Sequence, residues 1–196
     1  SQVATERYEA AREKVARFIN AKESKEIIFT RGATEGLNLL AHSLQEKFLS
    51  EGDEIIISTL EHHSNIIPWQ VASRKTGAKI IELKPDKDGN IEWSDYAKVI
   101  TRKTKLIALP HITNSIGSIL PVKKICDEAK KRNIISVVDG CQAAPHLQIN
   151  IQDINSDFYV FSGHKIYAPK GVGALYIRRK PRVRISSMIS GGGQER

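Results

Sequence analysis

The sequence has few cysteines and no long apolar stretch. Two of its 196 residues are cysteine, one is methionine and 6% are aromatic. Two cysteines, Cys126 and Cys141, are too few for a disulfide framework, and they lie in no Cys/His spacing typical of a metal site, which predicts a reducing compartment and no bound metal. No apolar run approaches the ~20 residues that cross a bilayer. Residues 1–21 have a charged helical pattern rather than that of a secretory signal, so we expect a cytoplasmic protein without a membrane partner, with an organelle matrix as the alternative location.

The chain carries a formal net charge of +8, while 40% of its residues are hydrophobic, as is ordinary for a globular protein. Its basic runs, at residues 123–124, 130–132 and 178–184, are scattered and contain no interleaved aromatic residues. Such runs are typical of solvated faces, so we predict no nucleic-acid partner. An anionic ligand such as a phosphate is the simpler reason for a basic pocket.

Short apolar runs alternate with helical patterns along the chain. The predicted strands are residues 26–30, 54–58, 78–83, 105–109, 134–138, 157–161 and 173–177. The predicted helices are a leading amphipathic helix within residues 1–22, one that begins after the turn at 31–36, and others at 68–75, 94–100 and 121–132. A long loop of mixed polarity is expected at 110–121.

This alternation predicts an α/β protein whose early strands pair in parallel through right-handed crossovers. The last two strands are joined by too few residues for a helical crossover, so the final strand should run antiparallel to its neighbour. We therefore expect one domain over residues 1–196 with a seven-stranded, mixed and mostly parallel sheet. The helix at 1–22 and a tail at 179–196 would be extensions of it.

Lys165 ends the stretch 161–165, whose sequence is Phe-Ser-Gly-His-Lys. It lies just beyond a predicted strand end, where open α/β sheets carry their ligands. A lysine placed there is partly desolvated and close to other cations, which favours its neutral amine. Such an amine can attack an aldehyde and hold it as a Schiff base. Alone, Lys165 would be read as a solvated loop lysine.

Other loops at the same predicted edge bring complementary groups. Ala33 and Thr34 begin a helix whose free amides and positive dipole end favour a phosphate, although a plain helix start has the same pattern. His62 follows the next strand, where an imidazole can lie flat on an aromatic ligand or move protons, although loop histidines are otherwise common. Asp139 ends the most apolar strand, where a carboxylate needs a partner such as a protonated ring nitrogen, or caps the following turn.

Four more polar side chains complete the set. Asn114 and Gln142 offer amides at the same edge, and Ser162 and His164 flank the lysine with donors for an anion. An amine, a carboxylate, an imidazole, amides and a phosphate cradle together suit pyridoxal 5'-phosphate. The sequence therefore predicts a pocket for this cofactor.

Three stretches carry a resemblance to a known family. Residues 61–65 (Glu-His-His-Ser-Asn), 139–142 (Asp-Gly-Cys-Gln) and 161–165 are similar to signatures of class V aminotransferase-fold enzymes, and above all of cysteine desulfurases, also called selenocysteine lyases. The resemblance runs from Arg31 to Gly193. It implies an enzyme, with the three-layer fold-type-I large domain of pyridoxal-phosphate transferases.

The resemblance also implies a role for each candidate residue. Lys165 would hold the cofactor covalently and move the substrate α-proton, His62 would stack on the cofactor ring, and Asp139 would pair with the pyridinium nitrogen. The remaining cofactor contacts would come from Ala33, Thr34, Ser162 and His164 at the phosphate, Gln142 at the phenolic oxygen, and Asn114 at the side that faces the substrate.

The reaction implied is the conversion of L-cysteine to L-alanine. The sulfur would pass to a cysteine of the enzyme and then to an acceptor or scaffold protein of iron–sulfur cluster assembly. A homodimer is implied as well, because the active site of this family borrows groups from a second subunit.

Two parts of the family pattern are not matched. Family members have a further segment before the position of Ser1, and a C-terminal domain after that of Arg196 with the sulfur-accepting cysteine and a substrate-binding arginine. Cys141 would lie behind the ring and is no substitute, so we expect little desulfurase turnover from residues 1–196 alone. The alternatives are another class V enzyme, such as a kynureninase-like lyase or an aminotransferase, and a non-catalytic interaction module that folds without cofactor.

Overall fold

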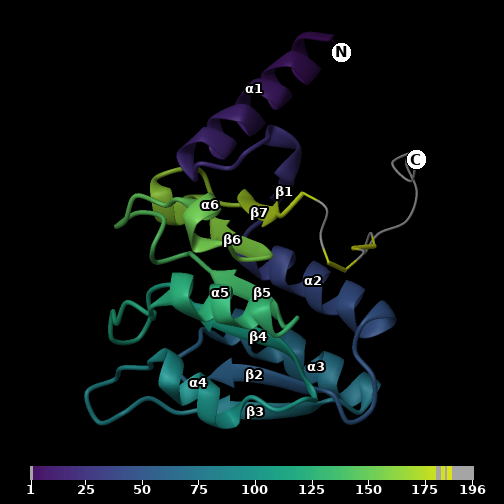
Figure 1. Ribbon diagram of the computed structural model, residues 1–196. Helices are drawn as coiled ribbons and strands as arrows, with labels where there is room; N and C mark the ends of the chain where they lie inside the picture. Colours follow the sequence, from purple (N-terminus) through teal and green to yellow (C-terminus); the bar gives the residue numbers. More distant parts are fainter. Residues whose placement is uncertain (1, 180–181, 184, 187–196) are drawn as a thin grey trace.

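The computed structural model describes residues 2–179, 182–183 and 185–186, so most of the predicted tail at 179–196 lies outside the described residues. Seven strands form one sheet in the order β1-β7-β6-β5-β4-β2-β3 (Figure 1). The strands are β1 (Ile27–Thr30), β2 (Glu54–Ser58), β3 (Lys79–Leu83), β4 (Thr104–Pro110), β5 (Ile135–Asp139), β6 (Phe158–Ser162) and β7 (Gly173–Ile177).

The helices are α1 (Gln2–Phe18), α2 (Ala33–Lys47), α3 (Ile67–Thr76), α4 (Trp93–Val99), α5 (Val122–Lys131) and α6 (Ile151–Ile154). Three short 3-10 turns lie at η1 (Ser24–Glu26), η2 (His63–Asn65) and η3 (Gly163–Ile166). None of the helices in the described part of the chain is long and apolar enough to cross a membrane.

The sheet is mixed and mostly parallel, as predicted. β3, β2, β4, β5 and β6 pair in parallel along the sheet order. β7 is antiparallel to β6, which confirms the prediction for the final strand. The expectation that every early strand pairs in parallel is wrong for β1, which lies at the sheet edge and pairs antiparallel with β7. Because one edge of β7 pairs with β6, the opposite edge of β7 is free to pair with β1.

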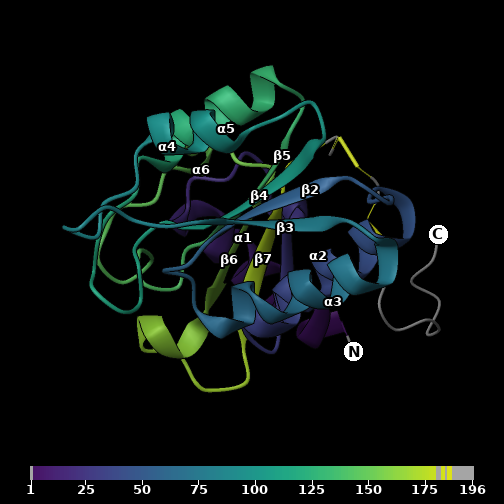
Figure 2. The same ribbon diagram turned by 90° about the horizontal axis from the view of Figure 1, so that it is seen from below.

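Helices cover both faces of the sheet, which makes three layers. Figure 2 shows α2 and α3 on one face and α4, α5 and α6 on the other. The alternation along β2 explains how one strand serves both layers, because Ile55 and Ile57 pack with the helices α2 and α3 while Ile56 packs on the opposite side. The sheet therefore contributes buried side chains to two apolar cores, one on each of its faces.

The leading helix extends away from this body (Figure 1). Of the residues in α1 only Ala16 is buried, and Ile19 just beyond it is buried as well. Tyr8, on the predicted apolar face, is half-exposed and places its ring edge-on to Phe29 of β1 at 5.2 Å between centroids. The predicted amphipathic pattern is present, but its apolar face is covered only near the end of the helix.

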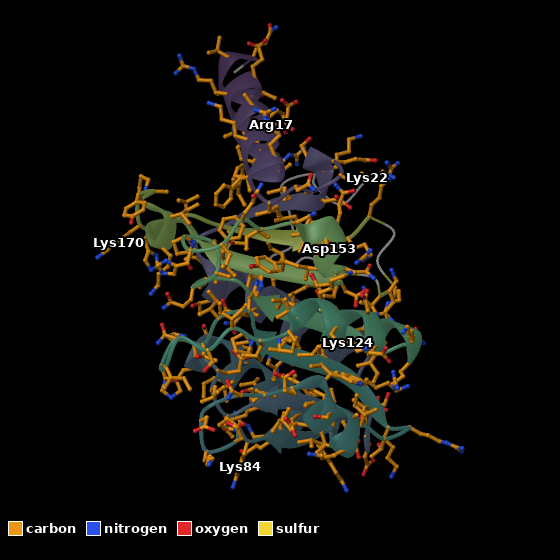
Figure 3. All side chains as sticks on the ribbon, turned by 60° about the vertical axis from the view of Figure 1, so that its left-hand side comes forward. Arg17, Lys22, Lys84, Lys124, Asp153 and Lys170 are labelled. Carbon is orange, nitrogen blue, oxygen red and sulfur yellow. The ribbon has the colours of Figure 1, made fainter. Side chains whose placement is uncertain are left out.

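The basic runs at 123–124 and 130–132 are exposed. The side chains of Lys84 and Lys170, which belong to none of the basic runs, also project from the periphery (Figure 3). On α5, Lys124 is paired with Glu128 at 3.2 Å, and Lys131 and Arg132 pair with the same carboxylate. The charge of these residues is therefore partly balanced by a neighbour on the same helix.

Candidate active site

A cavity of about 210 Å³ lies at the edge of the sheet where β4, β5 and β6 end. All nine residues predicted from the sequence line it: Ala33, Thr34, His62, Asn114, Asp139, Gln142, Ser162, His164 and Lys165. The register explains the convergence, because Pro110 at the end of β4 pairs with Asp139 at the end of β5. The carboxyl ends of parallel neighbours meet at one edge, which is where open α/β sheets bind their ligands.

Asp139 is the buried charge of the cavity. Its residue is 6% exposed, and its Oδ1 accepts a hydrogen bond from the backbone N–H of Cys141 at 2.9 Å. Burial raises the pKa of this carboxyl, whereas the hydrogen bonds from Cys141 and the charges of His62 and Lys165 act to lower it. A carboxylate in such a place favours a cationic partner within the cavity.

The backbone behind Asp139 is fixed by a close approach. A Cβ placed on Gly140 would lie 2.1 Å from ring atoms of Tyr159, so only glycine fits there. The phenol of Tyr159 shares a hydrogen bond of 3.0 Å with Nδ1 of His111, whose own backbone N–H donates to the carbonyl of Asp139 at 2.8 Å. These contacts join the ends of β4 and β5 to Tyr159 of β6.

The predicted anion-binding residues gather where α2 begins. The backbone N–H of Ala33 donates to Oγ of Ser162 at 2.9 Å, which joins the start of this helix to the end of β6. Thr34 and His164 are exposed and line the same cavity. The first turn of α2 thus presents amide donors and the positive end of the helix dipole to the cavity, together with two hydroxyl groups and an imidazole.

The other predicted groups line the remaining wall. His62 is exposed, and Ser64 holds its ring through a hydrogen bond of 2.8 Å between Nδ1 and Oγ. Nε2 of Gln142 donates to Oδ1 of Asn114 at 2.5 Å, so the two amides act as a pair. Lys165 is half-buried within η3 and lines the same cavity.

Five residues of the cavity wall were not assigned a role from the sequence: Glu61, Ser64, Pro110, Ile112 and Cys141. Glu61 is the most unusual, because both of its carboxyl oxygens are buried without a hydrogen-bond partner among the described residues. The sequence shows that Glu61 lies between β2 and His62, but not that its carboxyl is buried without a partner. Cys141 is partly buried, and burial followed by the charge of Asp139 raises the pKa of its thiol.

Among the described residues, no group of three or more His, Cys, Asp or Glu side chains is arranged to hold a metal ion. What the cavity offers is therefore organic recognition: anion donors at the start of α2, a buried carboxylate at the end of β5, and an amine and an imidazole between them.

Comparison with known proteins gives a consistent result. The sequence matches the aminotransferase class-V family over residues 1–196. A probable cysteine desulfurase of Halalkalibacterium halodurans is 47% identical over 190 residues, which are 97% of this chain and 47% of that protein. A cysteine desulfurase of Serratia proteamaculans is 44% identical over 179 residues, which are 91% of this chain and 44% of that protein. The chain thus spans about half the length of the curated relatives it matches.

Solved structures agree. The apo cysteine desulfurase of Thermococcus onnurineus NA1 superposes with a TM-score of 0.86 at 41% identity, over 92% of this chain and 44% of that one. The structure described as SspA in complex with cysteine gives a TM-score of 0.91 at 33% identity, over 98% of this chain and 55% of that one.

Proposed function

Because the chain belongs to the aminotransferase class-V family, we propose that its cavity binds pyridoxal 5'-phosphate and that the whole protein is a cysteine desulfurase. The support is the likeness to relatives that carry this name, at up to 47% identity. The observation that carries the proposal is the placement of Asp139 and Lys165 in one cavity although they come from different strand ends.

The residues present fit the cofactor. The backbone N–H of Ala33 and the side chains of Thr34, Ser162 and His164 form a donor set for the phosphate where α2 begins. The donor set suits a dianion, because helix amides and hydroxyl groups carry no negative charge. The opposite requirement holds for Asp139, whose buried carboxylate suits a protonated ring nitrogen.

The remaining contacts follow from the cavity wall. The flat face of the cofactor would lie against His62, whose ring is already oriented by Ser64. Gln142 would donate to the phenolic oxygen, and its partner Asn114 would border the substrate. The aldehyde would be held by Nζ of Lys165, which is half-buried and lines the cavity.

When bound, the cofactor would supply an electron sink for the bonds of an amino-acid substrate. The work left to this chain is then limited and specific. Asp139 holds a proton on the ring nitrogen, and Nζ of Lys165 takes and returns the α-proton of L-cysteine. The substrate class is L-cysteine or a related amino acid, and L-alanine is the carbon product.

The sulfur acceptor is a separate question. Both cysteines are free thiols, but burial raises the pKa of Cys126 to about 12 and also raises that of Cys141, so neither offers a reactive thiolate. The proposal therefore places the accepting cysteine, and the arginine that binds the substrate carboxylate, in parts of the whole protein beyond these residues. A homodimer that passes sulfur to an iron–sulfur assembly partner in the cytoplasm completes the proposal.

The direct test is cofactor attachment. Purified protein mixed with pyridoxal 5'-phosphate should develop a visible absorption band, and borohydride should bleach it and leave a label on Lys165 that peptide mass spectrometry locates. Lys165→Arg should abolish the band and the label. Lys170→Arg, at the exposed lysine of the same loop, is the matched control and should keep both. A colourless protein, or equal labelling of Lys165 and Lys170, would contradict the proposal.

A second measurement separates the related activities. The whole protein is incubated with cysteine, selenocysteine, kynurenine and other amino acids, and sulfide, alanine and other products are followed. Release of sulfide and alanine from cysteine, without turnover of kynurenine or of a transamination substrate, supports the desulfurase. Turnover of kynurenine or of a transamination substrate identifies another class V enzyme, and a folded protein that binds partners but no cofactor indicates an interaction module.

A further inference from the structure

A second carboxyl group lies in the wall of the same cavity, and the proposed function gives it no task. Glu61 follows β2, directly precedes His62, and is only 8% exposed. Neither of its carboxyl oxygens has a hydrogen-bond partner among the described residues. None of the ion pairs found between described residues includes it.

The groups that face Glu61 come from three elements. Asn65 of η2 is fully buried, and its Oδ1 accepts a hydrogen bond from Nε1 of Trp69 at 2.9 Å. The amide nitrogen of Asn65 is therefore the atom of this side chain that faces Glu61. Tyr96 of α4 is buried with an unpartnered hydroxyl, whose pKa is raised by burial and by the charge of Glu61. Asp139 at the end of β5 is the other titratable neighbour. No cation is among these facing groups.

The environments of the two carboxyls differ. Burial, and then the charge of Asp139, raise the pKa of Glu61 well above its usual value, and the smaller effect of Asn65 acts to lower it. Asp139 also lies buried, but it accepts the N–H of Cys141 and feels the positive charges of His62 and Lys165. When two carboxyls share a poorly solvated site, one keeps the proton, and it is the one with less support for its charge.

We propose that Glu61 is a positioning residue that stays protonated at neutral pH and so confines the negative charge of the cavity floor to Asp139. It acts through Asp139 and not on the cofactor itself. Its purpose rests on the proposed function, because one carboxylate matches one protonated ring nitrogen, whereas a second charge would remain buried without a partner. The proton on Glu61 itself does not require the cofactor.

The first test follows the pH dependence of unfolding for the cofactor-free protein and for Glu61→Gln, which mimics the protonated acid. The folded protein keeps this proton to higher pH than the unfolded chain does, so native Glu61 contributes stability that is complete below 4.5 and is lost as the pH rises. Glutamine carries no acidic proton, so the Glu61→Gln variant does not lose stability in this way. The ratio of the folding constant of Glu61→Gln to that of the wild type should therefore increase above pH 4.5, by at most about tenfold for each pH unit.

Glu128→Gln is the matched control. The hydrogen bonds from Lys131, Arg132 and Lys124 lower the pKa of Glu128 to about 2, so the same chemical change there should lose stability relative to wild type as the pH rises from 2 to the usual 4.5. The stability of each variant relative to the wild type should therefore change in opposite directions with rising pH: it falls between 2 and 4.5 for Glu128→Gln and increases above 4.5 for Glu61→Gln. A flat difference for Glu61→Gln between about pH 5 and about pH 8, or a slope of the same sign as that of Glu128→Gln, would overturn the proposal.

The second test asks whether the charge of Asp139 helps to hold the proton on Glu61. In an Asp139→Asn background one like charge is gone, so the advantage of Glu61→Gln at about pH 8 should shrink. An unchanged advantage would mean that burial alone holds the proton and would overturn the positioning role. The infrared band of a protonated carboxyl should be present in the wild type and absent from Glu61→Gln, and its absence from the wild type would also overturn the proposal. Because no step uses the cofactor, failure to bind it would count only against the proposed function.

Discussion

At Gly140 the chain passes so close to the ring of Tyr159 that a single added carbon has no room. A Cβ there would lie 2.1 Å from two ring atoms and 2.2 Å from the phenolic oxygen, on a strand end that is buried on both faces. Gly140→Ala should therefore lower the free energy of unfolding by about 2–4 kcal/mol or prevent folding, as overpacked cores do. Urea denaturation followed by circular dichroism measures the change.

Gly52→Ala is the reference for a glycine substitution without a steric clash. Gly52 has a φ of +82° and no atom within 4 Å of the added Cβ, so its substitution tests backbone strain alone, at a cost of about 1–2 kcal/mol. If Gly140→Ala is no more destabilising than Gly52→Ala, the ring of Tyr159 moves aside easily, and the close contact does not hold the end of β5 in place.

The burial of His111 should make the folded protein less stable in acid. Burial lowers the pKa of His111 from 6.5 to about 4. The unfolded state therefore binds a proton at His111 more readily than the folded state does. The contribution of neutral His111 to the free energy of unfolding is complete above pH 6.5 and is lost as the pH falls through about 4. The loss should reach about 3 kcal/mol, and His111→Gln, which has no proton to take up, should show much less of it over the same range.

Thermal unfolding between about pH 7 and about pH 4 measures this loss. The exposed His146 supplies the control, because His146→Gln should leave the acid-dependent loss as it is in the wild type. An unchanged loss in His111→Gln would show that another group causes the sensitivity to acid.

At the scale of elements, the apolar runs were enough to place all seven strands. The signal is clearest in β4, β5 and β6, which are mostly apolar and almost wholly buried. The partner of β1 was not predictable in this way. It depends on β7 turning back along β6, which is a contact between distant segments. The short helix α6, of four residues, was also missed, because it is too short to show a helical period.

The candidate site was predictable for a related reason. Residues just after parallel strands must meet at one edge, so Asp139 and Lys165 could be placed together from their positions in the sequence alone. Glu61 could not, because what sets it apart is the lack of any partner for a buried carboxyl. Burial and missing partners are properties of the packed molecule, and no local pattern reports them.

At the scale of the whole molecule, the chain returns to the sheet after β7. Arg182 bonds to Asp157 through Nη2 at 2.5 Å and Nε at 3.0 Å, and Nη2 also donates to the carbonyl of Ile134 at 2.6 Å. Asp157 is 2% exposed and also accepts the backbone N–H of Ser136 at 2.9 Å. One arginine thus joins the segment after β7 to the starts of β5 and β6, at the edge of the sheet opposite the cavity.

Arg182→Ala should lower the free energy of unfolding by about 3 kcal/mol, because it leaves the buried carboxylate of Asp157 with hydrogen bonds from Ser136 alone. Arg182→Lys should recover only part of this, since an ammonium group cannot make the two-point contact. Arg102→Ala, at an exposed turn, is the control and should stay within about 0.5 kcal/mol of the wild type. Cofactor binding by the folded variants should be retained, because the cavity lies at the other end of the strands. Equal stability of Arg182→Ala and Arg102→Ala would show that this ion pair does not fasten the segment to the sheet.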